Sequence, residues 1–364
     1  MKFKCERDTL ISALSRAGRA VTTKAGPVVG LSGVLLELSG DSLSVTGSDV
    51  DLTIADRITV SGSENGAALV QARLLTDIVR SLDLGAVEME FEDQALSVRA
   101  GRSEFSLRTM PASDFPRIPL LGEATVTVDG QALVGGLRQV VSAAGRDESR
   151  PVLTGVLLTA FGGGLRVVAT DSYRLAQRDL TSVSMEVGEK GVLVPSRALE
   201  EVSRLVVGDV RVGVQLDDNT VLFEVGETRL SARLINGDFP SYEGLIPTDH
   251  PNRLLTNRQN LLDAIRRVRL LALEQVPMRV SMQTGGLTLS ARAQDVGEAT
   301  EEVAASYEGE DLVIAFNAQY LHDGVEALDC EEIALLTADK LKPALLRTPE
   351  EDDFLYVLMP LRIT

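Results

Sequence analysis

The chain has little of several residue types, and each scarcity argues against a class of site. It has no tryptophan and only 4% aromatic residues among 364, which argues against a platform that stacks unpaired bases. Its two cysteines, Cys5 and Cys330, lie far apart and indicate neither a disulfide framework nor metal-ligand spacing. Its two histidines, His250 and His322, lack HExxH spacing, and no GxxxxGK[ST] phosphate loop is present. We therefore expect no resident metal or cofactor, and no ATPase.

Long hydrophobic runs are also missing. No apolar stretch approaches the roughly 18 residues that a membrane span needs. The first residues, MKFKCERD, lack the apolar core of a secretory signal. With few cysteines, this composition favours a cytoplasmic globular protein without a membrane partner.

Positive charge is scarce overall, because 53 acidic residues outnumber 36 basic ones and give a formal net charge of -17. Taken alone, this balance argues against nucleic acid, since phosphate binding depends on Lys and Arg. Net charge is an average, however, and the placement of the basic residues decides the matter.

What the chain does contain is a threefold repeat. LSVTGSDVDL begins at Leu43, LRVVATDSYRL at Leu165 and LTLSARAQDV at Leu287, with 122 residues between successive starts. The motif Asp-Phe-Pro at 114–116 returns 124 residues later at 238–240. A fixed period of this length predicts three tandem domains of one ancestral unit, at 1–120, 121–249 and 250–364. The repeated Asp49, Asp171 and Asp295 suit a turn-stabilising role.

Hydrophobic periodicity in the first repeat, carried over to the other two, predicts an α+β fold in which each domain has two helices and antiparallel strands. The predicted helices are 8–22, 72–82, 130–144, 195–206, 257–273 and 318–328, with Pro195 at a helix start. The predicted strands are 1–5, 33–38, 43–45, 87–91, 96–100, 156–159 and 165–169. Gly162 to Gly164 reads as a hairpin turn. The short linkers near 119–124 and 247–252 contain proline, which favours rigid junctions.

Basic residues recur at equivalent positions on the predicted helices. Arg73 and Arg80 are spaced i to i+7, on one helix face, as are Arg197 and Arg204 in the next domain. Amphipathic helices often carry Arg on their solvated face, so the repetition, more than the charge, suggests one basic surface for a polyanion. Such contacts would be to phosphate and carry no sequence information. The full predicted set is Arg16, Lys24, Arg73, Arg80, Arg138, Arg146, Arg197, Arg204, Arg266 and Arg267.

Several segments resemble the bacterial DNA polymerase III β subunit family, the sliding clamps, in order and spacing along the whole chain. They are RPVLTGVLL (150–158), LRVVATDSYRLA (165–176), LINGDFPSYEGLIP (234–247), IAFNAQYL (314–321) and YVLMPLR (356–362). The resemblance implies three tandem DNA-clamp domains, each with two helices on antiparallel sheets. Two chains would close head to tail into a six-domain ring around duplex DNA. The implied function is a non-enzymatic processivity factor.

The resemblance also implies partners. These are a second copy of the chain, duplex DNA of any sequence, the DNA polymerase III α subunit and the clamp loader complex. Other DNA polymerases, ligase and mismatch-repair proteins would bind through short linear peptides. Loading would need a separate ATP-driven opener, because this chain lacks a phosphate loop.

Two sites follow from matching motif to motif. A hydrophobic peptide cleft between domains 2 and 3 is expected, in which Met and Pro supply an adaptable apolar lining and Arg174 and Arg362 could bind a peptide backbone or carboxylate. The alternative is that VLMPL is only a buried last strand. The expected lining is Leu153, Thr170, Ser172, Tyr173, Arg174, Leu175, Pro240, Leu245, Asn317, Tyr320, Leu341, Pro343, Val357, Met359, Pro360, Leu361 and Arg362. The dimer seam is expected to pair Phe105 and Leu107 with Leu270 and Leu271.

This sequence departs from the family pattern near the cleft. Ser172-Tyr173 stands where members often have Gly-His, and Gly244 stands where some carry Arg. The peptide preference of the rim is therefore open.

Two alternatives remain open. A metal-dependent nuclease could use Glu88, Glu90, Glu92 and Asp93, although the alternation of a half-exposed strand explains these acids more simply. A specialised clamp paralogue, such as a drug-insensitive second copy, is also compatible with the sequence, and genomic context would distinguish it.

Overall fold

The computed structural model describes residues 1–22, 29–116, 122, 124–272, 276–350 and 353–362. Contacts divide the chain into two compact units. The first unit is Met1–Gly130 with Arg204–Leu234, and the second is Gln131–Ser203 with Ile235–Thr364. This division falls inside the predicted middle domain, and the predicted domain boundaries stay a prediction.

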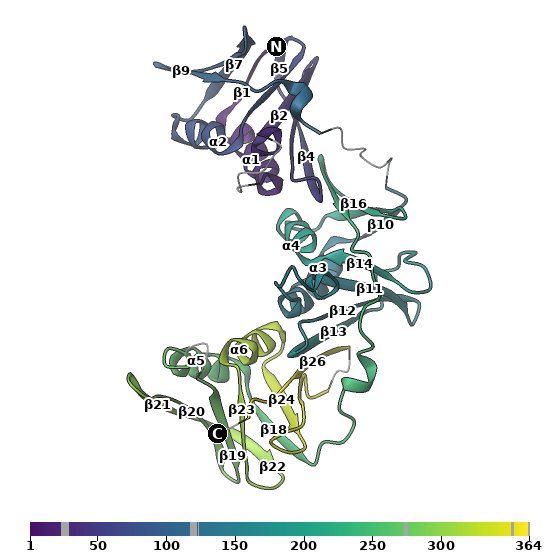
Figure 1. Ribbon diagram of the computed structural model, residues 1–364, viewed down its shortest axis with the longest axis vertical. Coiled ribbons are helices and arrows are strands. Elements are labelled where there is room, and N and C mark those ends of the chain that lie inside the picture. Colours follow the sequence, from purple (N-terminus) through teal and green to yellow (C-terminus); the bar gives the residue numbers. More distant parts are fainter. Residues whose placement is uncertain (23–28, 117–121, 123, 273–275, 351–352, 363–364) are drawn as a thin grey trace. The chain divides into compact units, whose positions relative to one another are not determined.

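The first unit contains a five-stranded and an eight-stranded antiparallel sheet, ordered β5-β1-β7-β8-β9 and β10-β15-β16-β17-β4-β3-β2-β6. Helices α1 (Arg7–Ala17) and α2 (Ala72–Ser81) lie side by side in this unit (Figure 1). Its strands are β1 (Lys2–Glu6), β2 (Gly33–Ser39), β3 (Ser42–Ser48), β4 (Leu52–Thr59), β5 (Ser61–Glu64), β6 (Gly66–Gln71), β7 (Ala86–Glu92), β8 (Ala95–Ala100), β9 (Ser103–Arg108), β10 (Val126–Asp129), β15 (Arg211–Leu216), β16 (Thr220–Val225) and β17 (Thr228–Arg233).

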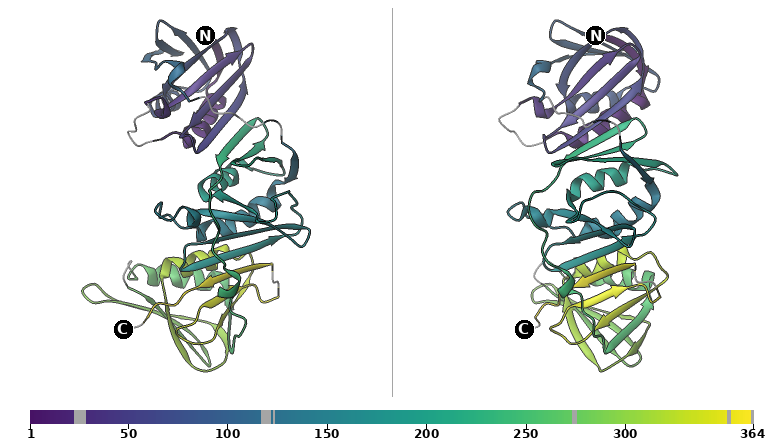
Figure 2. Two further views of the ribbon diagram at one scale, coloured as in Figure 1. Left: turned by 45° about the vertical axis from the view of Figure 1, so that its right-hand side comes forward. Right: turned by 90° about the vertical axis from the view of Figure 1, so that its right-hand side faces the viewer.

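The second unit has a nine-stranded sheet, β14-β11-β12-β13-β26-β25-β24-β18-β22, and a four-stranded sheet, β21-β20-β19-β23. Nearly all of α3 (Gly130–Val140) and α4 (Ser196–Leu205) belongs to it, with α5 (Arg258–Arg269) and α6 (Ala318–Ala327). Its strands are β11 (Gly155–Phe161), β12 (Gly164–Thr170), β13 (Arg174–Leu180), β14 (Val192–Pro195), β18 (Asn252–Asn257), β19 (Met278–Gln283), β20 (Gly286–Ala293), β21 (Gly297–Val303), β22 (Ala305–Glu308), β23 (Leu312–Phe316), β24 (Glu332–Thr337), β25 (Ala344–Arg347) and β26 (Phe354–Leu358). The six helices of the described residues thus accompany antiparallel sheets, and the turned views in Figure 2 show a helix layer beside a sheet layer in each unit.

The helices are buried along one face, as their periodicity predicts. Leu10 and Leu14 of α1 and Leu75 and Val79 of α2 are fully buried in one hydrophobic cluster with strand residues such as Phe3. The end of α1 lies so close to β3 that a Cβ on Gly47 would be 2.1 Å from the Ala17 carbonyl oxygen, so only glycine fits there.

Several predicted boundaries are wrong by a few residues. The helix predicted at 8–22 ends at Ala17, because the chain tightens into a 3-10 turn over Gly18–Ala20. A similar turn, Val141–Ala143, shortens the helix predicted at 130–144, and the helix predicted at 257–273 ends at Arg269. Pro195 is the last residue of β14, directly before α4, so the expected helix begins one residue later. Gly162 and Gly163 form the predicted hairpin turn, both with positive φ.

Two strand pairs join segments that the repeat assigns to different domains. β4 pairs with β17 in the first unit, where Asp56 lies opposite Thr228. β13 pairs with β26 in the second unit, where Arg178 lies opposite Phe354. Since Asp56 and Arg178 are 122 residues apart, these are equivalent connections, and each extends a sheet across a predicted domain boundary.

The segment between β17 and β18 packs closely on the nine-stranded sheet. Tyr242 is buried in a cluster with Leu175 and Val357, and Phe239 and Ile246 pack against the same cluster. The other predicted linker, 119–124, lies largely outside the described residues.

Candidate functional site

The predicted cleft residues include an unusual group of exposed apolar side chains in the second unit. Tyr173, Leu245, Leu341, Met359 and Leu361 are each between 38% and 63% exposed, although side chains of this size are usually buried. They come from the β12–β13 turn, the segment before β18, the β24–β25 loop and the segment after β26. An exposed apolar group drawn from several segments is a typical feature of a binding surface.

Backbone hydrogen bonds fix the segment after β26. The Met359 amide donates to the Tyr173 carbonyl at 2.9 Å, and the Leu361 amide donates to the Ala315 carbonyl at 2.8 Å. Pro360 between them has no amide hydrogen to satisfy. The strand ends at Leu358, so VLMPL is not simply a buried last strand.

A tight turn at 171–174 presents Tyr173. The Asp171 carboxylate accepts hydrogen bonds from the backbone amides of Tyr173, at 2.9 Å, and Arg174, at 3.0 Å. In the first repeat, Asp49 accepts from the Leu52 amide at 2.8 Å. The predicted turn-stabilising role is therefore confirmed for Asp49 and Asp171.

Arg174 lies under this surface with its side chain only 9% exposed. Its guanidinium donates to Asp171 at 3.0 Å, to Asp323 at 2.5 Å and to the Tyr356 hydroxyl at 3.3 Å, and it lies 4.3 Å from the Tyr320 ring centre. Burial acts to lower the pKa of Arg174, but Tyr356, Asp323 and Asp171 outweigh it and the net shift is upward. These bonds use the Nε and Nη1 atoms of Arg174 and hold the guanidinium in place beneath the surface.

Two tyrosines face each other across the site. The Tyr173 and Tyr320 rings are stacked with centroids 6.5 Å apart. Asn317 caps α6 by accepting hydrogen bonds from the Gln319 and Tyr320 amides. This cap fixes the first turn of the helix, which carries Tyr320. The Tyr356 hydroxyl donates to the Tyr320 carbonyl at 2.9 Å, and burial raises the pKa of Tyr356 well above its usual range.

The remaining predicted cleft residues fall into two groups. Leu153, Thr170, Leu175 and Val357 are buried and support the surface from below. The others are exposed or half-buried: Ser172, Pro240, Asn317, Tyr320, Pro343, Pro360 and Arg362. The sequence-based prediction missed Asp323 and Tyr356, although Tyr356 stands in the motif YVLMPLR.

The basic residues on the helices are placed less uniformly than the repeat suggests. Arg73 and Arg80 on α2 are strongly exposed on either side of Asp77. Arg16 instead binds Asp56 at 2.7 Å, and this buried carboxylate also accepts from Thr228, so Arg16 holds α1 to the β4–β17 pair. Exposed positions are also found for Arg138, Arg146, Arg197 and Arg204, whereas Lys24 lies outside the described residues.

On α5 the predicted arginines have acidic neighbours. Arg267 binds Glu301 of β21 at 2.6 Å, and this hydrogen bond raises the pKa of Arg267. Arg266 lies 3.5 Å from Asp263 and 3.6 Å from Glu326. The positive charge of α5 is therefore partly neutralised within the unit.

The predicted seam residues lie beside edge strands. β9, which carries Phe105 and Leu107, is the outer strand of the five-stranded sheet, and β21 is the outer strand of the four-stranded sheet. Leu107 is buried and Phe105 packs on the core, whereas Leu270 is 77% exposed at the end of α5. A Cβ on Gly297, the first residue of β21, would be 4.0 Å from the side chain of Leu271.

Two of the four acids proposed for a nuclease, Glu88 and Glu90, form ion pairs with basic side chains. Lys2 and Lys4 bind Glu88, at 3.8 and 3.4 Å, while Lys2 and Arg99 both bind Glu90 at 3.1 Å. Across the described ranges, the single group of acids and histidine close enough to share an ion is His322, Asp323 and Glu326. Both Asp323 oxygens there accept hydrogen bonds, from Arg174 and Gln319. The geometry gives the nuclease interpretation no support.

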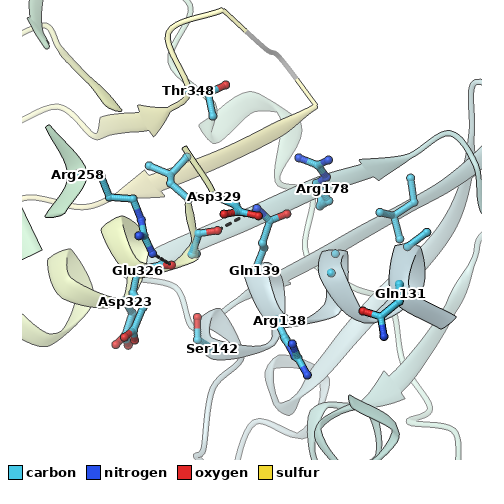
Figure 3. Close-up of a pocket in the computed structure, with 16 residues that line it drawn as sticks. Gln131, Arg138, Gln139, Ser142, Arg178, Arg258, Asp323, Glu326, Asp329 and Thr348 are labelled. Atoms are coloured by element: carbon cyan, nitrogen blue, oxygen red, sulfur yellow. Dashed lines mark hydrogen bonds between the residues drawn. The ribbon is translucent and has the colours of Figure 1, made fainter. Parts of the chain in front are cut away.

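A polar cavity of about 650 Å³ lies between α3, β13 and the end of α6 in the second unit. Gln139 donates to the Ala327 carbonyl at 2.9 Å and Arg258 donates to the Glu326 carbonyl (Figure 3). Arg258 also donates to the Val325 carbonyl. These side chains satisfy carbonyl groups that the last turn of a helix leaves unpaired. The cavity therefore marks a place where α3 and α5 hold the end of α6.

None of the helices within the described residues is long and apolar enough to cross a membrane.

Comparison with known proteins accounts for nearly the whole chain. Residues 1–119, 127–241 and 243–362 match the N-terminal, central and C-terminal domains, in that order, of the DNA polymerase III beta subunit. The beta sliding clamps of Streptomyces coelicolor and Pseudomonas aeruginosa are each 33% identical, with 100% of both chains covered. Among solved structures, the Bacillus subtilis sliding clamp has a TM-score of 0.90 at 29% identity. The Bartonella birtlesii clamp, bound to griselimycin, has a TM-score of 0.91 at 31% identity, and both comparisons cover 100% of each chain.

Proposed function

Because the chain belongs to the DNA polymerase III beta subunit family of sliding clamps, which are non-catalytic processivity factors, we propose that two copies close into a ring around duplex DNA. The ring tethers the replicative polymerase by topology, not by chemical affinity. We place this activity in the cytoplasm, with a separate clamp loader as the ATP-driven opener.

The observation that carries this proposal is the repeated strand pair. Asp56 of β4 faces Thr228, and Arg178 of β13, 122 residues later, faces Phe354. The position 122 residues after Arg178 is Thr300 on β21. Among the described residues, this edge strand does not pair with a strand from another repeat. The strand equivalent to β17 in the first repeat is β9, which is also an edge.

The repeat also supplies a register for the seam. Ser97 faces Ser106 in the β8–β9 pair, and Leu222 faces Ser231 in the β16–β17 pair, 125 residues later. Ser231 in turn faces Thr53 of β4, whose equivalent two repeats later is Gly297. Ser106 of one copy therefore pairs with Gly297 of the other, beside Leu271. An unpaired edge strand is an aggregation hazard, and closure of the ring gives each edge a partner.

The second part of the proposal concerns the exposed apolar group around Tyr173, Leu341 and Met359. This surface binds short linear peptides from the DNA polymerase III α subunit and the clamp loader. Other DNA polymerases, ligase and mismatch-repair proteins use the same surface. Met and Pro side chains suit such a surface because they adapt to different peptides at little entropic cost. Griselimycin, bound by the Bartonella birtlesii clamp, is a further candidate ligand of this chain.

The third part concerns DNA. Exposed arginines at equivalent positions, such as Arg73, Arg80, Arg197 and Arg204, face the duplex and contact phosphate without reading sequence. The net charge of -17 disfavours DNA binding elsewhere on the protein. The contact between these arginines and the DNA phosphates is weak and mobile, as sliding requires.

Retention on DNA at high salt tests the proposal. After loading onto a nicked circular duplex, the protein should stay bound in a salt concentration that abolishes phosphate contacts, and should be released once the circle is cut. Equal loss from circular and linear DNA would rule out topological linkage. The nuclease alternative is tested by incubating the protein with labelled duplex DNA and Mg²⁺. Cleavage of the DNA that Glu90→Gln abolishes would contradict the clamp proposal.

A further inference from the structure

The buried charges beneath the peptide surface form a connected set that reaches beyond the predicted cleft. Arg174 comes from β13 and Asp323 from α6, and their side chains are 9% and 16% exposed. The guanidinium of Arg174 lies against the Tyr320 ring, and Arg174 is the residue directly after Tyr173 in the chain. One ion pair therefore connects the two segments that present the stacked tyrosines.

Asp323 is itself oriented from the other side. One of its carboxylate oxygens accepts from Arg174, and the other accepts from the Gln319 amide at 2.5 Å. The Gln319 oxygen accepts from Arg269 of α5 at 2.7 Å. The chain of bonds thus runs from α5, through Gln319 and Asp323, to Arg174.

We propose that Asp323 is a positioning residue for peptide binding, which holds Arg174 beneath Tyr320 and so fixes the Tyr173–Tyr320 pair for a partner peptide. Asp323 is not among the residues expected to line the cleft, and it acts through Arg174 without touching the peptide. This inference rests on the proposed peptide-binding function.

The physical reason is the cost of leaving a buried guanidinium partly unpaired. Removing one member of a buried ion pair is strongly unfavourable, because the remaining charge has lost its water as well as its partner. After Asp323→Asn, Arg174 keeps Asp171 but loses its charged partner on α6. The guanidinium is then drawn towards Asp171 and away from the Tyr320 ring, so the two tyrosines lose their common support.

The test compares Asp323→Asn with wild type in binding to purified DNA polymerase III α subunit. We expect affinity to fall about tenfold, the size typical of one charge-assisted hydrogen bond. Asp329→Asn is the matched control, an exposed acid just beyond the same helix, and should bind as wild type does. Because the chain has five tyrosines and no tryptophan, near-ultraviolet circular dichroism reports on the tyrosines, and its change in Asp323→Asn alone marks movement of the pair.

A double-mutant cycle separates positioning from general destabilisation. If Asp323 acts through Arg174, Asp323→Asn should cost no further affinity in an Arg174→Gln background. Gln319→Leu supplies a second variant at an exposed position, where folding is not at risk, and we expect an intermediate loss of affinity.

The outcomes are distinguishable. If wild type binds the α subunit while Asp323→Asn and Gln319→Leu bind equally tightly, the positioning role is wrong and the proposed function stands. Additive losses in the double mutant would also overturn it. If wild type fails to bind the α subunit at all, the proposed peptide-binding function fails, and this inference fails with it.

Discussion

Ser172 has a backbone conformation that side chains seldom adopt. Its φ is 79°, and Val50, 122 residues earlier in the equivalent turn, has φ 82°. A residue with a Cβ in this region is strained by roughly 1–2 kcal/mol, a strain that glycine avoids. The turn places the Tyr173 carbonyl where the Met359 amide reaches it, so the strain is maintained by the surrounding hydrogen bonds.

Replacing Ser172 by glycine should therefore stabilise the protein. The strain energy that glycine relieves in the folded state is larger than the free-energy cost of the extra backbone freedom of glycine in the unfolded chain. We therefore expect the free energy of unfolding to rise by up to about 1 kcal/mol. Denaturant unfolding measures the change. Ser184→Gly is the control, since Ser184 is exposed and has a negative φ, and it should lose stability. A loss of stability in Ser172→Gly would show that the side chain outweighs the strain.

Sequence reasoning at this scale succeeds where an interaction is local. Asp171 bonds to amides two and three residues away, so a repeated Asp after a strand is enough to predict the turn. The partners of Arg174 cannot be predicted in this way, because Asp323 is 149 residues distant. Motif matching therefore places Arg174 at the cleft but misses its bonds to Asp323 and Tyr356.

Helix α2 presents the clearest basic face of the described helices. Arg73 and Arg80 have side chains that are 92% and 61% exposed, and their ion pairs with Asp77, at 3.9 and 3.4 Å, are solvent-exposed and weak. They remain available to a phosphate.

Charge reversal on this helix should weaken DNA binding without opening the ring. For Arg73→Glu with Arg80→Glu we expect slower loading and less stimulation of synthesis on primed circles. The slope of log affinity against log salt should become shallower by roughly 0.9 for each phosphate that the variant no longer neutralises. Lys190→Glu, an exposed cation on a loop, is the control. Unchanged synthesis at moderate salt would contradict the assignment of α2 to the DNA side.

The segment after β26 is the other element with a separable role. Ending the chain after Leu358 removes Met359 and Leu361, and we expect binding of the α subunit to be abolished while the protein remains dimeric. Removing only residues 363–364 is the matched control. Sizing chromatography and a binding assay check both variants, and a monomer after the longer truncation would show that this segment also supports the seam.

Elements are predictable from sequence to the extent that their pattern is strong. All six helices of the described residues are predicted, the first two from apolar spacing and the others from the repeat, with errors at ends such as Gly18 where the last turn tightens. Strands such as β4 and β17 did not come from periodicity, because short strands carry few repeats of their pattern. Their pairing joins residues more than 170 apart in sequence, which no local pattern specifies.

At the scale of the whole molecule, the proposed seam is open to a single-residue test. Ala100 and Ser103 close a two-residue hairpin, so the Ser103, Phe105 and Leu107 amides point to β8 and the Ser106 amide points outward. Ser106→Pro should remove one hydrogen bond from the seam while sparing those to β8.

We expect Ser106→Pro to shift the protein from dimer to monomer at concentrations where Ser106→Ala stays dimeric. Analytical ultracentrifugation measures the change, and thermal unfolding checks that the fold is kept. A Ser106→Pro dimer as tight as wild type would place the seam elsewhere.

The strand pairs between repeats have a mechanical consequence. Arg16 and Thr228 reinforce one of them by binding Asp56, while Arg174 and Arg178 reinforce the other by binding Asp323 and Asp353. A loader that pulls on the protein would have to break these ion pairs and the strand pairing to separate the repeats within one chain. The contact between two copies of the chain has no covalent connection. The gate through which DNA enters should therefore be the intermolecular joint, which can reseal without any part of the polypeptide refolding.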